Sequence, residues 1–321
     1  MMKIACISGI TGQDGSYLAK LLIENNYKVI GLVRSYNNLN YENFKYLGIN
    51  NKITLEECDL LDFSSIINIL IKYSPTEFYN LAGQSSVGGS FEQPIGTINF
   101  NTQSILNILE SVRLLKLDTR IYQASSSEMF GEVKVLPVNE TTPLHPLSPY
   151  AISKASGYWI GINYRESYNL YCVNGILFNH ESYLRRPNFF IKKVIRTSLE
   201  IKNGSNKILH VGNIDIKRDF GYAPDYVMAM WLSLQQDIPD DYLICSGESI
   251  YLRDIIKYVF DYLGISHDKL FVDKTLFRPT EIKDMYGDNT KARVSLKWEY
   301  TKSFYNVLDI LIEEEIINFK G

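Results

Sequence analysis

A glycine-rich segment between a short apolar run and an amphipathic stretch constrains the fold most. Lys3 to Ser8 forms the apolar run, Gly9-Ile-Thr-Gly12-Gln-Asp-Gly15 follows, and apolar side chains then recur at helical spacing. This order predicts a strand, a glycine turn and a helix. In a βαβ unit such glycines let the backbone approach a pyrophosphate, which binds the amide groups at the positive end of the helix. The spacing is Gly-x-x-Gly-x-x-Gly, so an ordinary glycine-rich turn is the alternative.

Strands and helices are predicted to alternate along the chain. Strands are expected at residues 3–8, 28–33, 53–56, 77–81, 120–124, 172–178 and 242–245. Helices are expected at 64–73, 102–115, from 150, and at 225–235, 251–263 and 303–319, with a surface loop over 37–51. Such alternation predicts an α/β fold with a Rossmann-like, doubly wound parallel sheet. We assign 1–178 to a dinucleotide-binding domain, to which some later segments return, and 179–321 mainly to a smaller mixed substrate lobe.

Composition limits the classes of partner. The 321-residue chain has 21% charged residues and a formal net charge of -3, which provides no basic field for nucleic acid or an anionic membrane. No signal peptide is recognisable and no apolar run approaches ~18 residues, so we expect a soluble, cytoplasmic protein. The four cysteines are scattered and form no cluster with the four histidines. We therefore expect buried thiols, with neither disulfides nor a metal site.

The segment from residue 125 to residue 154 is the strongest candidate for a catalytic centre. It places Ser-Ser-Ser-Glu at 125–128 ahead of Tyr150-Ala-Ile-Ser-Lys154. If a helix begins here, Tyr150 and Lys154 share a face, with Cβ atoms roughly 5–6 Å apart. The lysine charge should favour the phenolate and draw the tyrosine pKa down from ~10 toward the range of a general base. Among 23 tyrosines this spacing also arises by chance, so the upstream segment supplies needed support.

Two further patterns bear on the ligands. The second predicted strand ends at Val33-Arg34 without the carboxylate that NAD-binding folds usually carry there. An arginine suits a 2′-phosphate, so we favour NADP over NAD, unless Arg34 is simply a solvated surface residue. Asp59, after the third strand, is expected to meet the adenine edge. Positive charges also concentrate between residues 185 and 218; a solvated face explains some of them, and a diphosphate-bearing substrate explains the others.

With these motifs in view, the sequence resembles the extended short-chain dehydrogenase/reductases and, within them, the GDP-mannose 4,6-dehydratases. The matching segments are GITGQDGSYL (9–18), NYRESY (163–168), NGILFNHES (174–182) and GDNTKA (287–292), spread over nearly the whole chain. The resemblance implies a GDP-sugar substrate, an NADP cofactor and a homodimer or homotetramer. The implied catalytic set is Ser126, Glu128, Tyr150 and Lys154.

The same resemblance implies two groups of binding residues. Those expected to line the cofactor site are Gly9, Gly12, Gln13, Asp14, Gly15, Arg34, Asp59, Leu60, Ala82, Gly83, Gln84, Lys154, His180 and Arg186. Those expected to bind the nucleotide-sugar are Ser85, Asn179, Lys193, Arg218, Arg278 and Glu281.

The chain departs from the family pattern near both ligands. Arg34 is followed by Ser35 rather than by a second arginine, and Ser86 replaces a frequent histidine. The loop 183–187 carries an extra residue, which leaves open whether Arg185 or Arg186 faces the cofactor, and the segment before residue 278 is short. The sugar is therefore either mannose or a manno-heptose.

Glu128 separates the reaction classes. In the implied reaction Tyr150 assists oxidation at C4, Glu128 removes the C5 proton, water leaves from C6, and hydride returns to C6. A 4-epimerase or 4-reductase on the same scaffold has no elimination for this carboxylate to serve, and it is the alternative function. A silent NADP-binding regulator is disfavoured because both Tyr150 and Lys154 are present. Glu128 could instead be a helix-entry acid favoured by the dipole.

Overall fold

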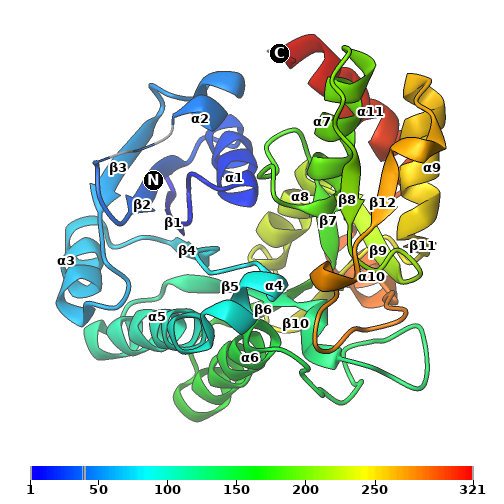
Figure 1. Cartoon of the computed structure of the whole chain (residues 1–321). Coiled ribbons are helices and arrows are strands. Elements are labelled where there is room, and N and C mark those ends of the chain that lie inside the picture. Colours follow the sequence, from blue (N-terminus) through cyan, green and yellow to red (C-terminus); the bar gives the residue numbers. More distant parts are fainter. Residues whose placement is uncertain (1, 38, 40, 320–321) are drawn as a thin grey trace.

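The computed structural model describes residues 2–37, 39 and 41–319, and a seven-stranded parallel sheet lies at its centre (Figure 1). The strands are β1 (Ile4–Ser8), β2 (Lys28–Val33), β3 (Ile53–Glu57), β4 (Glu77–Asn80), β5 (Arg120–Ser126), β6 (Cys172–Leu177) and β10 (Asp241–Ile244). Their order is β10-β6-β5-β4-β1-β2-β3, with every neighbouring pair parallel. The order reverses between β1 and β4, and ligands of such sheets bind beyond the carboxyl ends near the reversal.

Helices cover both faces of this sheet, which explains why its strands are apolar along their length. One face carries α1 (Gln13–Glu24), α2 (Glu42–Tyr46), α8 (Ala223–Ser233) and α10 (Thr290–Leu296), whose apolar side chains share one core. The other carries α3 (Phe63–Tyr73), α5 (Pro94–Leu115) and α6 (Pro149–Tyr168) around a second core. The short helix α4 (Val87–Glu92) follows β4. The predicted doubly wound α/β fold is confirmed.

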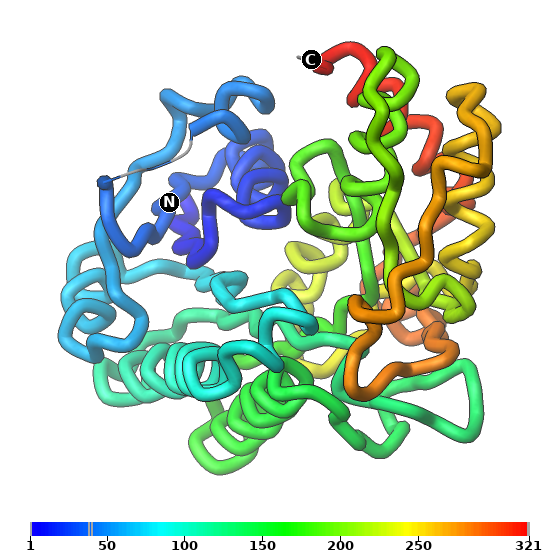
Figure 2. Tube along the Cα trace, viewed as in Figure 1, coloured from blue at the N-terminus to red at the C-terminus, as the bar shows by residue number. Residues whose placement is uncertain are grey.

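A second lobe lies beside the carboxyl ends of the main sheet (Figure 1). It holds a three-stranded sheet of β11 (Ser249–Tyr251), β9 (Lys217–Tyr222) and β7 (Asn179–Glu181), and a pair formed by β8 (Leu209–Val211) and β12 (Leu270–Val272). Helices α7 (Phe190–Lys202), α9 (Leu252–Leu263) and α11 (Phe304–Asn318) enclose its own core. Short 3-10 turns are η1 (Ser127–Phe130), η2 (His267–Lys269) and η3 (Lys274–Leu276). Figure 2 shows α11 beside α7, far from it in sequence.

Two sequence expectations need correction. The loop predicted over residues 37–51 contains α2, whose Phe44 is buried against the core of the first face. Helix α5 begins at Pro94 rather than at residue 102, because a proline at the first helical position has its φ preset for a helix. Strand β10 returns to the main sheet as its edge, and α8 packs on α1. The division near residue 178 stays a prediction.

Three general expectations concern thiols, metals and membranes. All four cysteines are buried and free, as expected. Within residues 2–37, 39 and 41–319, no group of three or more His, Cys, Asp or Glu side chains is arranged to hold a metal ion. In the same part of the chain, no helix is long and apolar enough to cross a membrane.

Candidate active site

Two helix starts bring the predicted catalytic residues together. Ser126 ends β5, and its hydroxyl caps η1 by accepting a hydrogen bond from the Glu128 amide at 3.3 Å. Ser148 caps α6 by accepting from the Ala151 amide at 3.1 Å, and proline follows at the first helical position. Such caps fix where a helix begins. Tyr150 and Lys154 therefore lie in the opening turns of α6, directed at the end of β5.

These four side chains line one cleft between the main sheet and the second lobe. The sequence-predicted residues that border the cleft are Asp14, Ser85, Ser126, Glu128, Tyr150, Lys154, Asn179, His180, Lys193, Arg218 and Arg278. Segments from both halves of the chain thus meet at the point where the strand order reverses, as the topology predicts.

The Tyr150 phenol is buried. Burial raises the pKa of Tyr150 to about 12; a hydrogen bond with Ser126 opposes the rise, and the Glu128 charge adds to it. We expected Lys154 to lower this pKa, and that expectation is wrong here. The lysine amine donates to the Ala124 carbonyl at 2.8 Å and lies 5.8 Å from the centre of the phenol ring.

Lys154 is itself perturbed by burial, which lowers its pKa to about 8. A buried ammonium without a paired carboxylate is disfavoured relative to the neutral amine. The ammonium has three hydrogens, and Ala124 is the one acceptor found for it among the described residues. Two donors thus remain for a ligand in the cleft.

The glycine turn has the close-packed form that a dinucleotide site requires. Gly9 has a φ of +71°, and a Cβ there would lie 2.8 Å from the Ala82 amide nitrogen. A Cβ on Gly15 would lie 2.3 Å from the Gly9 carbonyl oxygen, so neither position accepts a side chain. Helix α1 then begins after Gly12, and no side chain in the described part of the structure caps it, which leaves its first amides for an anion.

A second feature of the cleft also fits a nicotinamide dinucleotide. The Ser125 hydroxyl lines the cleft and is buried without a hydrogen-bond partner among the described residues. A buried polar atom of this kind normally has a partner, so its position calls for a polar ligand group. With the glycine turn and the free donors of Lys154, these residues fit a bound dinucleotide.

Asp14 and His180 form a hydrogen-bonded pair at the edge of the cleft, with the histidine buried and the aspartate half-buried. The carboxylate oxygen Oδ2 lies 2.9 Å from His180 Nε2, and His180 Nδ1 lies 2.7 Å from the Phe178 carbonyl. Burial raises the pKa of Asp14, but the His180 charge and hydrogen bond outweigh it and hold the pKa at about 2. Burial lowers the pKa of His180, and Asp14 raises it more. Gln13 donates to the His180 carbonyl at 3.1 Å, so the glycine turn is tied to β7.

The other predicted cofactor residues lie along the carboxyl ends of the first strands. Arg34 is exposed directly after β2. Asp59 is exposed and accepts from the Leu61 amide at 3.0 Å, while Leu60 is buried. After β4, the backbone amide of Gln84 donates to the Asn101 side chain at 2.9 Å. The Gln84 Oε1 atom is buried and has no hydrogen-bond partner within residues 2–37, 39 and 41–319. Ala82 and Gly83 complete that turn.

Arg185 rather than Arg186 borders the catalytic cleft. Its guanidinium stacks on Phe189, 3.7 Å from the ring centre, and its Nε lies 3.3 Å from the buried Glu181 carboxylate. The ion pair with buried Glu181 places the Arg185 side chain toward the cleft. Arg186 is exposed and lines an adjoining pocket beside Gly12, which Arg185 also borders. The predicted contact of Arg186 with the cofactor stays a prediction, and Arg185 is a residue that the sequence left undecided.

The predicted substrate residues differ in burial. Arg218 is buried, and one guanidinium nitrogen donates to the carbonyls of residues 217 and 282, each at 2.7 Å. Burial lowers the pKa of Arg218, and the Glu128 charge opposes this. Arg278 is exposed at the mouth of the cleft. Glu281 does not border the cleft, although its charge reaches Arg218.

An apolar wall of the cleft was missed from the sequence. It comes from α7, the end of β8, the approach to β9, the start of α9 and η3. Isolated apolar residues in separate segments look like ordinary core, so no sequence signal marks them. The residues are Phe190, Val211, Ile216, Leu252 and Leu276.

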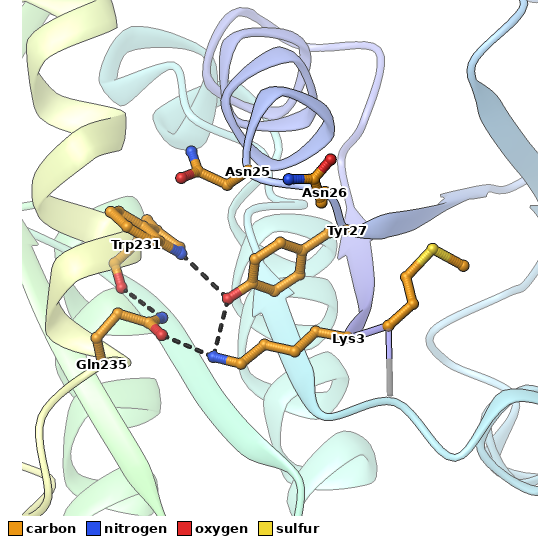
Figure 3. A pocket seen from close by; sticks show the side chains of 7 residues that line it. Lys3, Asn25, Asn26, Tyr27, Trp231 and Gln235 are labelled. Atoms are coloured by element: carbon orange, nitrogen blue, oxygen red, sulfur yellow. Dashed lines mark hydrogen bonds between the residues drawn. The ribbon is translucent and has the colours of Figure 1, made fainter.

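A second pocket, shown in Figure 3, lies at the amino end of β1 and is not a candidate site. Lys3 donates to the Tyr27 hydroxyl at 3.1 Å and to Gln235 at 2.9 Å, and the Trp231 indole donates to the same hydroxyl at 3.2 Å. These polar groups satisfy one another and leave little for a ligand. The pocket also lies at the amino ends of the strands, whereas the catalytic cleft lies at their carboxyl ends.

Comparison with known proteins agrees with this geometry. The family model described as GDP-mannose 4,6 dehydratase matches residues 6–311. The chain belongs to the GDP-mannose 4,6-dehydratase family. GDP-mannose 4,6 dehydratase 1 of Arabidopsis thaliana is 43% identical over 98% of this chain and 90% of that protein. The human GDP-mannose 4,6 dehydratase is 38% identical over 98% of this chain and 91% of its own length.

Solved structures with lower sequence identity to this chain share its fold. The UDP-glucose 4-epimerase of Thermotoga maritima superposes with a TM-score of 0.87 at 23% identity, covering 99% of this chain and all of that one. The dTDP-glucose 4,6-dehydratase of Streptomyces venezuelae, solved with NAD bound, gives 0.87 at 20% identity, over 98% and 97%. Epimerases and dehydratases therefore share this scaffold, and the fold alone does not choose between them.

Proposed function

We propose that this protein is a GDP-sugar 4,6-dehydratase, a hydro-lyase that converts a GDP-mannose-type sugar to its 4-keto-6-deoxy derivative. The observation that carries the proposal is Glu128 in the same cleft as Ser126, Tyr150 and Lys154. A 4-epimerase or 4-reductase uses the last three groups and has no elimination for a carboxylate to serve. Membership of the GDP-mannose 4,6-dehydratase family supports the same choice.

Each catalytic side chain has one task in this proposal. Tyr150 takes the proton of the C4 hydroxyl, and Ser126 shares the hydrogen bond to that oxygen. The resulting C4 ketone acidifies the C5 proton, and Glu128 removes that proton and passes it to the C6 hydroxyl, which leaves as water. C5 takes up a proton again when C6 receives the hydride. When bound, a nicotinamide ring would supply a hydride acceptor for C4 in its oxidised form and a hydride donor for C6 in its reduced form, and the oxidised form would supply a positive charge that favours the Tyr150 phenolate. Lys154 holds a ribose hydroxyl with its two remaining donors.

We infer NADP as the cofactor. The turn from Gly9 to Gly15 and the amide end of α1 would hold the pyrophosphate. Arg34 is exposed at the end of β2, where a 2′-phosphate is expected, and this position carries no carboxylate to bind a free 2′-hydroxyl. Both features support NADP over NAD.

We propose mannose as the first sugar to test and a manno-heptose as the second. The relatives named as acting on GDP-mannose match along nearly the whole chain, which supports mannose. Two departures from the family pattern, at Ser86 and around residue 278, lie at the cleft where the sugar would bind, which is why the manno-heptose is the second sugar to test.

We also infer a cytoplasmic homodimer or homotetramer. Apolar side chains are exposed on α5 and α6, which pack against each other: Ile95 is 84% exposed, Trp159 58% and Ile152 42%. Exposed apolar side chains on two packed helices are typical of a subunit interface. No field of positive charge favours nucleic acid as a partner.

Substitution of Glu128 tests the proposal. Glu128→Gln keeps the side-chain shape and removes the base, so we expect reduced cofactor to form at the enzyme in a single turnover while water loss stops. The reaction is followed by cofactor absorbance and by the mass of the sugar product. The exposed Glu299→Gln variant, after α10 and away from the cleft, is the control and should dehydrate normally. Dehydration by Glu128→Gln at the normal rate would contradict the assignment.

A further inference from the structure

Asp219 is a fully buried carboxylate on β9 that the proposed chemistry does not use. Its oxygen Oδ1 accepts from the Ser246 amide at 2.9 Å and from the Ser246 hydroxyl at 2.6 Å. Its Oδ2 accepts from the Gly247 amide at 3.0 Å and the Gly287 amide at 3.4 Å. One carboxylate thus joins three separate segments of the chain.

No basic side chain forms an ion pair with Asp219 among the described residues. Burial raises the pKa of Asp219 to about 6, and the hydrogen bonds from residues 246, 247 and 287 oppose the rise. A buried charge held only by neutral donors is costly, and a structural role alone is served as well by apolar packing. This suggests that Asp219 serves function by fixing the positions of the segments that it joins.

The segments joined by Asp219 carry the predicted substrate residues. Arg218 is its neighbour on β9, and the Asn179 side chain donates to the Asp219 carbonyl at 3.2 Å. The Asp219 amide donates to the Met285 carbonyl at 3.0 Å, and Arg218 donates to the carbonyl of residue 282 at 2.7 Å. The segment 282–287, which follows Arg278, is therefore fixed to β9 through both backbone and side chains.

We propose that Asp219 is a positioning residue for the nucleotide-sugar: it holds Arg218, Asn179 and the 278–287 segment in one arrangement without touching the ligand. The inference rests on the proposed GDP-sugar substrate, whose diphosphate would meet Arg218. Asp219 itself does not border the cleft. Its effect must therefore pass through these neighbours, and it should act on substrate binding rather than on the chemical step.

An asparagine at position 219 can accept only half of the hydrogen bonds that the carboxylate accepts. An amide has one oxygen acceptor, so Asp219→Asn can keep the two bonds to Ser246 but turns an NH₂ group toward the amides of Gly247 and Gly287. The 278–287 segment then loses the bond from the Gly287 amide, and its remaining bonds to β9 are those from the Asp219 amide to Met285 and from Arg218 to residue 282. We expect the KM for GDP-mannose to rise roughly tenfold, the effect of losing buried hydrogen bonds to a charged group, with kcat within about twofold.

Two further variants complete the test. Ser246→Ala removes one hydrogen-bond donor to Asp219 and keeps the carboxylate, so its KM for GDP-mannose should rise by about two- to fivefold. This milder variant provides the test if Asp219→Asn does not fold. Asp288→Asn is the matched control: this carboxylate is next to Gly287 but accepts from the Thr290 amide at 2.9 Å at the start of α10. Its KM should match that of the unsubstituted protein. Hydrogen exchange of residues 278–287 should rise in Asp219→Asn and stay unchanged in Asp288→Asn.

Binding of GDP, measured by calorimetry, separates the two proposals. If the unsubstituted protein binds GDP and the folded Asp219→Asn and Ser246→Ala variants bind it equally well, the positioning role is wrong and the proposed function stands. A fall in kcat at unchanged KM, or an equal loss of NADP affinity, also overturns the role. If the unsubstituted protein binds no GDP, the proposed function fails, and the inference with it.

Discussion

The two sides of the cleft are built differently. On the cofactor side, one continuous turn from Gly9 to Gly15 supplies a backbone surface that excludes side chains, and α1 supplies free amides. On the substrate side, the candidate groups come from β7, α7, β9 and the 278–287 segment. The first is a property of local sequence, and the second depends on contacts between segments far apart in the chain.

The contrast teaches where single substitutions should act. The backbone of the glycine turn tolerates polar changes nearby, because its ligand groups are main-chain amides. The substrate side relies on buried charges such as Arg218 and Asp219, whose positions depend on a few hydrogen bonds. Changes on that side should alter KM, whereas changes where the two sides meet should alter kcat.

The largest effect is expected at Tyr150, where the two sides meet. Tyr150→Phe removes the proton acceptor and should lower kcat by about 10²–10⁴, because general acid-base groups contribute this much. Measurement of product formation from GDP-mannose gives the rate, and NADP affinity should be unchanged. Tyr168→Phe, on the exposed end of the same helix, should have normal activity. Equal rates for the two variants would remove Tyr150 from the mechanism.

The next effect is the pH dependence set by Lys154. Because its pKa is about 8, kcat should fall roughly tenfold per pH unit above that value as the ammonium is lost. An arginine stays charged, so the residual activity of Lys154→Arg should be flat over the same range. The folded-state pKa lies below the usual 10.5, so the lysine costs stability below pH 8, and this cost shrinks as pH rises from about 8 to 10.5. A flat profile in the unsubstituted protein contradicts this role.

Substitutions of Arg185 and Arg186 test whether the catalytic cleft or the adjoining pocket contributes more to ligand binding. Arg185→Met should weaken ligand binding by roughly tenfold, since it removes a half-buried charge at the cleft and leaves Glu181 without its partner. Arg186→Met removes an exposed charge and should change affinity by less than about threefold. Titrations with NADP and with GDP measure both. A larger effect at Arg186 would reverse the assignment.

The smallest effect is expected at the outer rim, and it should differ between the two sides. Arg34→Ala should weaken NADP binding by about threefold to tenfold, leave NAD binding unchanged and leave GDP binding unchanged. Arg278→Ala should show the reverse pattern, with weaker GDP binding at constant NADP affinity. Fluorescence titration of the reduced cofactors and calorimetry with GDP supply these values. If Arg34→Ala weakens NAD and NADP equally, the 2′-phosphate contact is wrong.

The sequence predicted the parts of the molecule that depend on local spacing. The glycine turn, the parallel sheet and the opening of α6 at Tyr150 all follow from patterns within about twenty residues, and the structure confirms these elements. The direction of the Tyr150 pKa was wrong, because it depends on burial and on the distant carbonyl that binds Lys154.

Other features could not be read from the sequence because they arise only after folding. Whether Arg185 or Arg186 turns inward depends on the buried Glu181. The apolar wall and the bonds of Asp219 join segments separated by tens of residues, and none of them carries a local motif. Sequence patterns thus describe the cofactor side better than the substrate side.

One incubation tests the central claim most directly. The purified protein, with a small amount of NADP, is given GDP-mannose and GDP-manno-heptose in separate reactions, and product mass and nicotinamide absorbance are followed together. The proposed dehydration predicts a product lighter by one water, formed over many turnovers with no net change in reduced cofactor. A product of unchanged mass, or one NADPH consumed for each product, would contradict it.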